Sequence, residues 1–254
     1  MKPSIEGASE FAGIVAVLFS IELVRYLLIP AALFLVFTFI LRGFANRRSL
    51  YRSSLSKRRV GFEIGYSIST ILIFSLIGAA PYVSYLKPYA KIYRDVALYG
   101  WPWLGVSFIL LFIVFDAYFY WTHVALHKFK RLRRFHRIHH VSENPTPLAT
   151  HSFHPAEALI HVVWTLPLVF LIPIHINILI AFNTLTLIHN AFAHSGVEIY
   201  PRRWLRRRLF NYLSTPSFHQ SHHHDPSANF GLTFLWWDKW MGTYRSPNGD
   251  ARDS

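Results

Sequence analysis

The chain has 254 residues, a formal net charge of +13, 52% hydrophobic residues and only 15% charged residues. This composition is more apolar than that of an ordinary soluble domain and favours a membrane protein. Because the sequence contains no cysteine, it excludes disulfides, iron–sulfur clusters and zinc–thiolate sites, and any metal must be bound by histidine, carboxylate, amide or water.

Four apolar regions are long enough to enter a bilayer: residues 11–41, 61–86, 104–126 and 158–188. In the first, the best span is Leu23 to Leu41, and Pro30 is expected to kink it. We expect a membrane helix here and not a cleavable signal peptide, because no small-residue cleavage site follows the apolar run. The fourth region is too long for one crossing. Since Pro167 and Pro173 interrupt it, we predict a helical hairpin there.

Three clusters of basic residues lie beside these apolar regions, at 42–59, 128–137 and 202–208. The positive-inside rule places all three in the cytoplasm, and the alternating crossings then bring the histidine-rich segments to the same face. Basic residues at the ends of apolar spans argue against a nucleic-acid partner and predict contact with anionic lipid headgroups.

We therefore predict an all-α fold, in which residues 1–254 form a single integral membrane domain. The domain is a helical bundle of about three full spans plus the hairpin, with a His-rich cytosolic helical cap. Within it we expect N-terminal transmembrane helices over 1–100, the histidine-bearing region over 101–244, and a polar tail over 245–254.

Histidines recur at helical spacing in three places. His123 and His127 are four residues apart and share one helix face. The pattern H-x-x-H-H occurs at 136–140 and again at 219–223, and on a helix it spreads its imidazoles into a fan that could serve two neighbouring metals. A single pair could be ordinary interfacial histidines, but two copies of this pattern are improbable by chance.

The number of imidazoles limits the kind of metal site. A structural zinc needs four ligands and a haem needs one or two. A carboxylate-type di-iron bundle would show Glu-x-x-His pairs, which this histidine-rich region lacks. Two metal ions held almost wholly by nitrogen fit the pattern best, and imidazole suits iron, zinc and copper.

The motifs have a characteristic order. They read HVALH (123–127), HRIHH (136–140), HPAE (154–157), HSG (194–196), HQSHH (219–223), NFG (229–231) and WDKWMGTY (237–244). As a set, over about residues 100–244, they resemble the fatty acid hydroxylase / sterol desaturase superfamily. The resemblance implies an integral membrane di-iron oxygenase, which uses O₂ and two electrons to hydroxylate or desaturate a C–H bond of a sterol, fatty acyl or related lipid.

The resemblance also implies which residues bind the two iron ions. The metal-ligand candidates are His123, His127, His136, His139, His140, His194, His219, His222 and His223. Further ligand candidates are His154, His189 and Asn190. Carboxylates that could orient the imidazoles are Asp116, Glu157, Asp225 and Asp238, although each could instead balance nearby Arg or Lys.

Other histidines are expected to have no direct role in metal binding. We interpret His151 and His224 as bystanders and His161 as a core residue, and we place His175 on the far side of the membrane. Aromatic residues could line the path of the substrate or simply form core and lipid-facing surface: Phe115, Tyr118, Phe119, Trp164 and Phe182.

A separate electron donor of the ferredoxin or cytochrome type is implied, and the basic face could dock it or contact lipid headgroups. Two alternatives from other classes stay open. One is a zinc-dependent membrane hydrolase, and the other is a non-catalytic metal- or lipid-binding membrane protein.

Overall fold

The computed structural model describes residues 5–51, 56–83, 87–205, 207, 210 and 212–246. Four sequence predictions fall partly outside these residues: the basic clusters at 42–59 and 202–208, the end of the second apolar region at 86, and the polar tail, of which 247–254 are not described.

The chain begins with a long interrupted helix. Its parts are α1 (Ile5–Tyr26), the π-helical turn η1 (Leu27–Ala31), α2 (Ala32–Leu35), a second π-helical turn η2 (Val36–Ile40), and the short α3 (Arg42–Arg47). Pro30, which has no backbone N–H to donate, lies in η1, so the predicted disturbance widens the helix locally without ending it. Exposed Leu28 and Ile40 give this segment an apolar outer surface suited to lipid.

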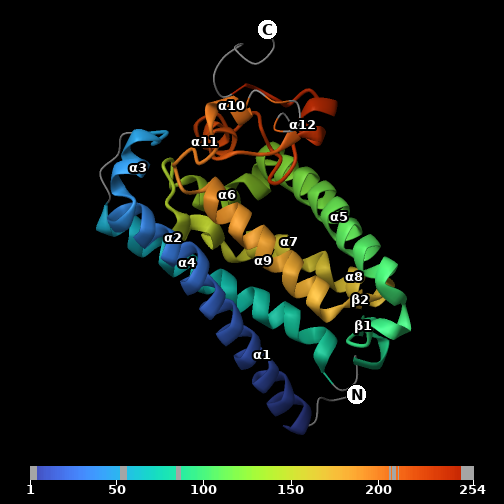
Figure 1. Cartoon of the computed structure of the whole chain (residues 1–254). Helices are drawn as coiled ribbons and strands as arrows, with labels where there is room; N and C mark the ends of the chain where they lie inside the picture. The colour runs from blue at the N-terminus through green and yellow to red at the C-terminus, as the bar shows by residue number, and fades with distance from the viewer. Residues whose placement is uncertain are drawn as a thin grey trace.

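Two further long helices follow. α4 (Lys57–Ala79) packs against α1 and ends in the 3₁₀ turn η3 (Ala80–Tyr82). Two short 3₁₀ turns, η4 (Lys87–Tyr89) and η5 (Val96–Leu98), then lead to α5 (Gly100–Lys128). In Figure 1, α4 and α5 lie on opposite sides of the central helix α9.

The predicted hairpin is present between residues 155 and 193. Its first arm consists of α7 (Pro155–Val163) and α8 (Thr165–Leu171), and its second arm is α9 (Ile176–Ala193). The turn between them contains the two-residue strand β2 (Ile174–His175), which pairs in parallel with β1 (Ile92–Tyr93). This small β-pair ties the turn of the hairpin to the segment that precedes α5.

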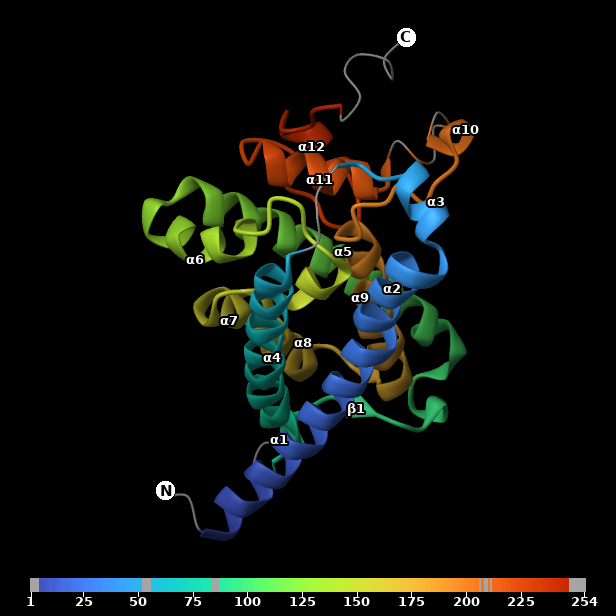
Figure 2. The same ribbon diagram turned by 90° about the vertical axis from the view of Figure 1, so that its left-hand side faces the viewer.

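Short helices form a cap at one end of the bundle. They are α6 (Lys130–His140), η6 (Pro147–His151), α10 (Arg202–Leu205), α11 (Pro216–His224) and α12 (Trp236–Trp240). Both ribbon views place α3, α6, α10, α11 and α12 at the end opposite the N-terminus (Figures 1 and 2). The described parts of the basic clusters therefore share one end of the molecule with the histidine-rich segments.

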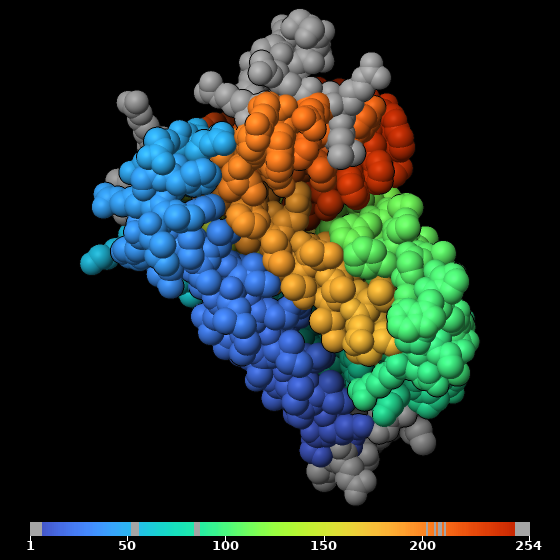
Figure 3. All heavy atoms as spheres, in the orientation of Figure 1, coloured from blue at the N-terminus to red at the C-terminus, as the bar shows by residue number. Residues whose placement is uncertain are grey.

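Among the described residues, four helical segments are long and apolar enough to cross a bilayer: Gly7–Ile40, Lys57–Tyr82, Gly100–Lys128 and Ile176–Ala193. The first arm of the hairpin, Pro155–Leu171, is apolar but shorter. The prediction of an all-α membrane bundle with a His-rich helical cap is confirmed, and the first span is longer than the predicted Leu23–Leu41. Figure 3 shows α1 and α9 side by side on one face, with α5 beyond α9.

Buried polar contacts hold the loop before η6 against the membrane helices. Glu63 of α4 is fully buried and accepts hydrogen bonds from Ser142 Oγ at 2.8 Å and Thr146 Oγ1 at 2.5 Å. Tyr26 Oη and Ser67 Oγ both donate to the carbonyl oxygen of Leu148, at 2.8 and 2.9 Å. Since a buried carboxylate without partners would be costly, these bonds fix the loop that lies beside the histidines.

Candidate di-metal centre

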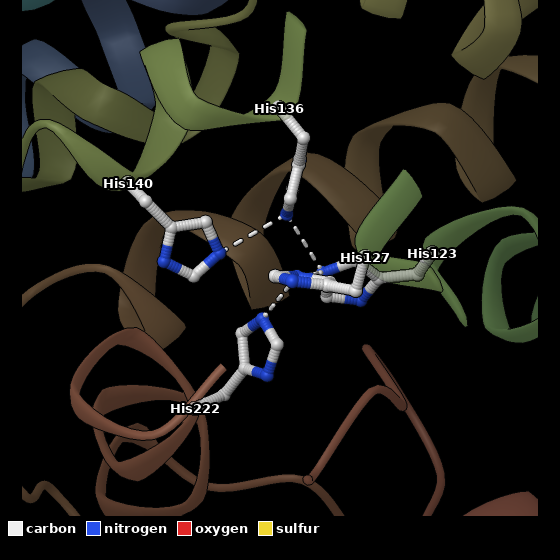
Figure 4. A group of neighbouring side chains, drawn as sticks. All are labelled: His123, His127, His136, His140 and His222. Carbon is white, nitrogen blue, oxygen red and sulfur yellow. Dashed lines mark hydrogen bonds between the residues drawn. The ribbon is translucent and has the colours of Figure 1, made fainter. Parts of the chain in front are cut away.

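Five histidines from three helices converge at the cap end of α5. They are His123 and His127 of α5, His136 and His140 of α6, and His222 of α11, and each offers a ring nitrogen within 4.8 Å of the others. Figure 4 shows the rings pointing toward one another from the three helices. We call this set the five-histidine group.

Four more histidines form a second set, the four-histidine group. They are His139 of α6, His194 at the C-terminus of α9, and His219 and His223 of α11. All four are buried, and their ring nitrogens also lie within 4.8 Å of one another. Each group could hold one metal ion. The structure thus brings together all nine histidines that the sequence singled out.

Each H-x-x-H-H segment divides its histidines between the two groups. In α6, His136 and His140 lie on one side and His139 on the other, and in α11 His222 separates in the same way from His219 and His223. The groups are neighbours, since the rings of His140 and His223 are 4.7 Å apart between centroids. The fan expected from helical spacing is therefore present.

The outer nitrogens of several of these rings face acceptor oxygens. Nδ1 of His123 lies 2.7 Å from Phe230 O, and Nδ1 of His194 lies 2.9 Å from Asn190 O. Similar contacts join His222 to Ala228 O at 2.7 Å, His139 to Ser152 O at 3.3 Å, and His136 to Glu157 Oε1 at 2.6 Å. A carbonyl oxygen can only accept, so these contacts place the proton on Nδ1 and leave a lone pair on Nε2.

The Nε2 atoms then meet at distances that hydrogen bonding does not explain. His123 Nε2 lies 3.1 Å from His136 Nε2, and His139 Nε2 lies 3.2 Å from His194 Nε2. Two lone pairs facing each other repel unless a cation lies between them. With metal–nitrogen bonds of about 2.0–2.1 Å, neighbouring ligands around one metal are about 2.9–3.4 Å apart, which fits these contacts.

The cap histidines are held in the neutral form that metal binding requires. Burial lowers the pKa of His136, His139, His219 and His223 well below the usual value, and neighbouring imidazoles lower it further. The donor set thus consists of neutral imidazoles, as a metal site needs.

Glu157 is the carboxylate that contacts a candidate ligand within the described ranges. It is fully buried at the start of α7, where Oε1 accepts from His136 Nδ1 and also lies 3.4 Å from His161 Nε2. Its other oxygen, Oε2, has no hydrogen-bond partner among the described residues. His161, which the sequence suggested only as a core residue, is therefore a second partner of this carboxylate.

The NFG motif supplies the carbonyl oxygen that orients His123. Asn229 has a φ of 62°, and its side chain bonds Ser221 Oγ and the backbone of Arg245. A Cβ on Gly231 would lie 2.5 Å from Phe234 O, so the turn requires glycine there. These residues hold Phe230 O in place.

Two of the carboxylates proposed to orient the imidazoles, Asp238 and Asp116, form hydrogen bonds with this loop and not with a histidine. Asp238 accepts from the backbone N–H groups of Phe230 and Gly231, at 2.8 and 2.7 Å. Asp116 accepts from Phe234 N at 3.1 Å and from the indole N–H of Trp236. Both therefore act on the imidazoles only through the backbone of the loop.

The three further ligand candidates lie outside both groups. His154 is the N-cap of α7, and its Nδ1 accepts from Ala156 N at 3.1 Å. His189 Nε2 donates to Leu232 O at 2.9 Å. Asn190 donates through Nδ2 to Thr150 O at 3.0 Å, and its backbone oxygen accepts from His194. Of these three residues, only Asn190 contacts a histidine of either group, through its backbone oxygen.

The remaining histidines and Asp225 belong to neither histidine group. His175 lies in β2 at the hairpin turn, away from α6 and α11 (Figure 1), and its Nε2 bonds Arg94 O at 2.8 Å. His224 contacts Gln220, and Asp225 pairs with Arg245 on the surface. His151, which the sequence suggested as a bystander, lines an internal cavity. No spacing in the sequence could have indicated that position, because it depends on how η6 packs.

A cavity of about 250 Å³ lies between the helices of the bundle, and no histidine of either group lines it. Phe119 and Phe153 line the cavity and also contact the site. The ring centroids of Phe119 and His123 are 5.2 Å apart, and those of Phe153 and His139 are 5.0 Å apart. Four of the five aromatic residues proposed for a substrate path line the cavity: Phe115, Phe119, Trp164 and Phe182. The fifth, Tyr118, donates to Ile160 O.

Acid is expected to destabilise the metal-free protein. Burial lowers the pKa of His140 and His222 to about 3 and that of His194 to about 4, from 6.5. Below pH 6.5 the unfolded chain takes up protons that the folded chain does not, so the free energy of unfolding falls with the pH down to about 3 to 4.

The measurement is the melting temperature in detergent between pH 7.5 and 4, with and without added Fe²⁺. The metal-loaded protein serves as the control and should melt higher throughout. A metal-free protein whose melting temperature rises on acidification would contradict the neutral, buried state of these rings.

Comparison with known proteins identifies the family. Residues 108–243 match the family model described as fatty acid hydroxylase. A Delta(7)-sterol 5(6)-desaturase of Gibberella zeae is 28% identical over 86% of this chain and 64% of its own length. Lathosterol oxidase of Homo sapiens is 27% identical over 76% of this chain and 63% of its own length. A methylsterol monooxygenase of Aspergillus fumigatus is 31% identical over 59% of this chain and 50% of its own length.

No solved structure matches the chain. The chain spans less than two thirds of the length of each of these three relatives. The family match covers more than half of the chain and contains every histidine of both groups. The chain belongs to the fatty acid hydroxylase family.

Proposed function

We propose that the protein is a membrane oxygenase that binds two iron ions, one in each histidine group, and oxidises a C–H bond of a membrane sterol with O₂ and two electrons. One observation carries this proposal. Within each group, Nε2 atoms that bear lone pairs face each other, at 3.1 Å for His123 and His136 and at 3.2 Å for His139 and His194. The Nδ1 atoms of His123 and His194 meanwhile donate to backbone oxygens. A pair of redox-active irons supplies O₂ reduction and C–H oxidation, which imidazoles alone cannot perform.

The protein's own residues would orient the imidazoles and keep water away from the metals. Glu157 and the backbone oxygens of Phe230 and Asn190 hold the imidazoles in one tautomer. Phe119 and Phe153 line the cavity and contact His123 and His139, so they would keep the space between a lipid in the cavity and the metals apolar and poor in water. The sterol class is supported by the names of the three relatives, and hydroxylation and desaturation are both compatible with this geometry.

The experiment is a metal and product analysis of the full chain. Purified protein should contain two irons, and cells that express it should contain an oxidised sterol only when O₂ is present. One zinc per chain together with full activity in the absence of O₂ would replace the proposal with a membrane hydrolase. An unchanged lipid profile would favour a non-catalytic metal- or lipid-binding protein.

We also propose that the cap faces the cytoplasm and meets a separate electron donor of the ferredoxin or cytochrome type. The basic side chains of α6 and its flanks would face an acidic donor, with lipid headgroups as competing partners. A rate of reduction that is insensitive to salt would argue against docking on this face.

The orientation predicts opposite labelling of the two ends. Because the sequence has no cysteine, single substitutions can be labelled without background. Val141→Cys lies exposed at the cap and Tyr89→Cys lies exposed in η4. In sealed vesicles with the cytoplasmic side inside, an impermeant maleimide should label Tyr89→Cys fully and Val141→Cys only after permeabilisation. The reverse pattern would place the histidines on the other side.

A further inference from the structure

The cavity contains polar side chains that the candidate metal centre does not use. Glu22 and Arg25 of α1 line it and form an ion pair, with Arg25 Nη1 2.5 Å from Glu22 Oε1. Both side chains are only partly exposed, at 24% and 17%. Charged groups inside a membrane span are costly and tend to face a cavity and serve a function.

This ion pair leaves hydrogen-bonding capacity unused. Only one of the Glu22 oxygens bonds Arg25, and Arg25 Nε is buried without a partner among the described residues. A guanidinium has five N–H donors, and a carboxylate can accept at both oxygens. The pair therefore offers donors and an acceptor beside the cavity while its net charge is close to zero.

A third polar side chain lines the same cavity from α9. Asn183 of α9 lines the cavity, and its amide makes no hydrogen bond within the part of the chain that the structure describes. It lies two turns before Asn190 on the same face of α9. An unpaired amide in an apolar span is unfavourable unless a ligand satisfies it, because no water is available in the bilayer core.

We infer that Glu22, Arg25 and Asn183 form a recognition site for the hydroxyl group of a neutral lipid alcohol held in the cavity. A hydroxyl both donates and accepts, so it can pair with the acceptors and the donors that these side chains leave unused. A carboxylate or sulfate only accepts and would meet the negative charge of Glu22. Phe115, Trp164 and Phe182 would contact the apolar body of the same molecule.

This site deepens the proposed function, because it selects the class of lipid that reaches the metals. Glu22 and Arg25 lie before residue 108, where the match to the family begins. They would therefore act as specificity residues outside the part of the chain that matches the family model.

The test measures binding of three probes to the purified, iron-loaded protein in lipid nanodiscs: radiolabelled cholesterol, cholesteryl methyl ether and cholesterol sulfate. Cholesterol should bind at least about fivefold more tightly than the other two, as expected for one hydrogen bond that they cannot make. Asn183→Leu replaces the amide with an apolar side chain of similar size, and it should weaken cholesterol binding about fivefold with little effect on the ether.

Two further variants complete the design. The neutral double variant Glu22→Gln/Arg25→Gln should abolish the discrimination against cholesterol sulfate. Asn177→Leu, on the same helix but exposed outside the cavity, should change none of the three affinities. Any of three results would overturn the inference. The first is a preference for the hydroxyl that survives Asn183→Leu, and the second is tighter binding of cholesterol sulfate than of cholesterol by the wild-type protein. The third is the absence of saturable cholesterol binding.

Binding and oxidation are read separately. A protein that binds cholesterol selectively but oxidises no sterol would contradict the proposed function and leave the recognition site intact. A protein that oxidises a sterol without distinguishing the three probes would contradict only the recognition site.

Discussion

Replacing His139 with alanine is expected to reduce the iron content from two to about one per chain and to lower lipid oxidation at least about a hundredfold. His139 is buried in the four-histidine group, where its Nε2 lies 3.2 Å from His194 Nε2. Its loss leaves three imidazoles for one metal but does not touch the five-histidine group. Even residues that only orient ligands typically cost ten- to a hundredfold when removed, so a ligand should cost at least the upper value.

The paired variant and the control make this prediction specific. His123→Ala should remove the metal of the other group, again leaving about one iron per chain, and the double variant should leave none. His224→Ala follows directly after His223 in the sequence but lies outside both groups, and it should retain two irons. Metal analysis of the folded protein, with its melting temperature as a check, measures all four. A His139→Ala protein with two irons and unchanged oxidation would contradict the assignment.

The sequence predicts the histidine groups well because helical spacing alone determines much of their geometry. His136 and His140 are four residues apart and reach the same group, while His139 between them reaches the other. The same periodicity divides the histidines of α11. Apolar length and proline positions likewise predict the spans and the hairpin, because each depends on local sequence.

The supporting interactions could not be predicted, because they depend on how distant segments pack. His123 and His222 are oriented by backbone oxygens of Phe230 and Ala228, and a backbone oxygen has no signature in the sequence. Asp116 lies seven residues before His123 on the same helix, yet it bonds the loop at 234–236, about 120 residues later. A carboxylate near a histidine in sequence is therefore weak evidence that the two are in contact.

The length of the first span shows a related limit. The sequence favours Leu23–Leu41 within an apolar region that Glu22 and Arg25 interrupt, but the helix continues through both residues from Gly7 to Ile40. The two charged side chains can lie inside the span because they pair with each other beside the cavity. What looks like the boundary of a span is instead a polar feature inside one.

Glu157→Gln is expected to lower iron affinity or lipid oxidation by about ten- to a hundredfold while leaving the fold intact. The glutamine oxygen can still accept from His136 Nδ1, so the ring keeps its orientation, but the negative charge that makes the imidazole a stronger donor to the metal is lost. Because Glu157 is fully buried and its carboxylate lies 2.6 Å from that nitrogen, water cannot replace the charge.

Two comparisons separate this effect from simple destabilisation. Glu143→Gln changes an exposed carboxylate of the neighbouring loop and should leave metal affinity unchanged. Glu157→Ala removes both the charge and the acceptor, so it should lose more iron than Glu157→Gln, and it should also melt at a lower temperature. If Glu157→Gln binds two irons with the affinity of the wild-type protein, the carboxylate serves only to hold α7 against α6. A loss of affinity at an unchanged melting temperature would instead show that its charge acts on the metal through His136.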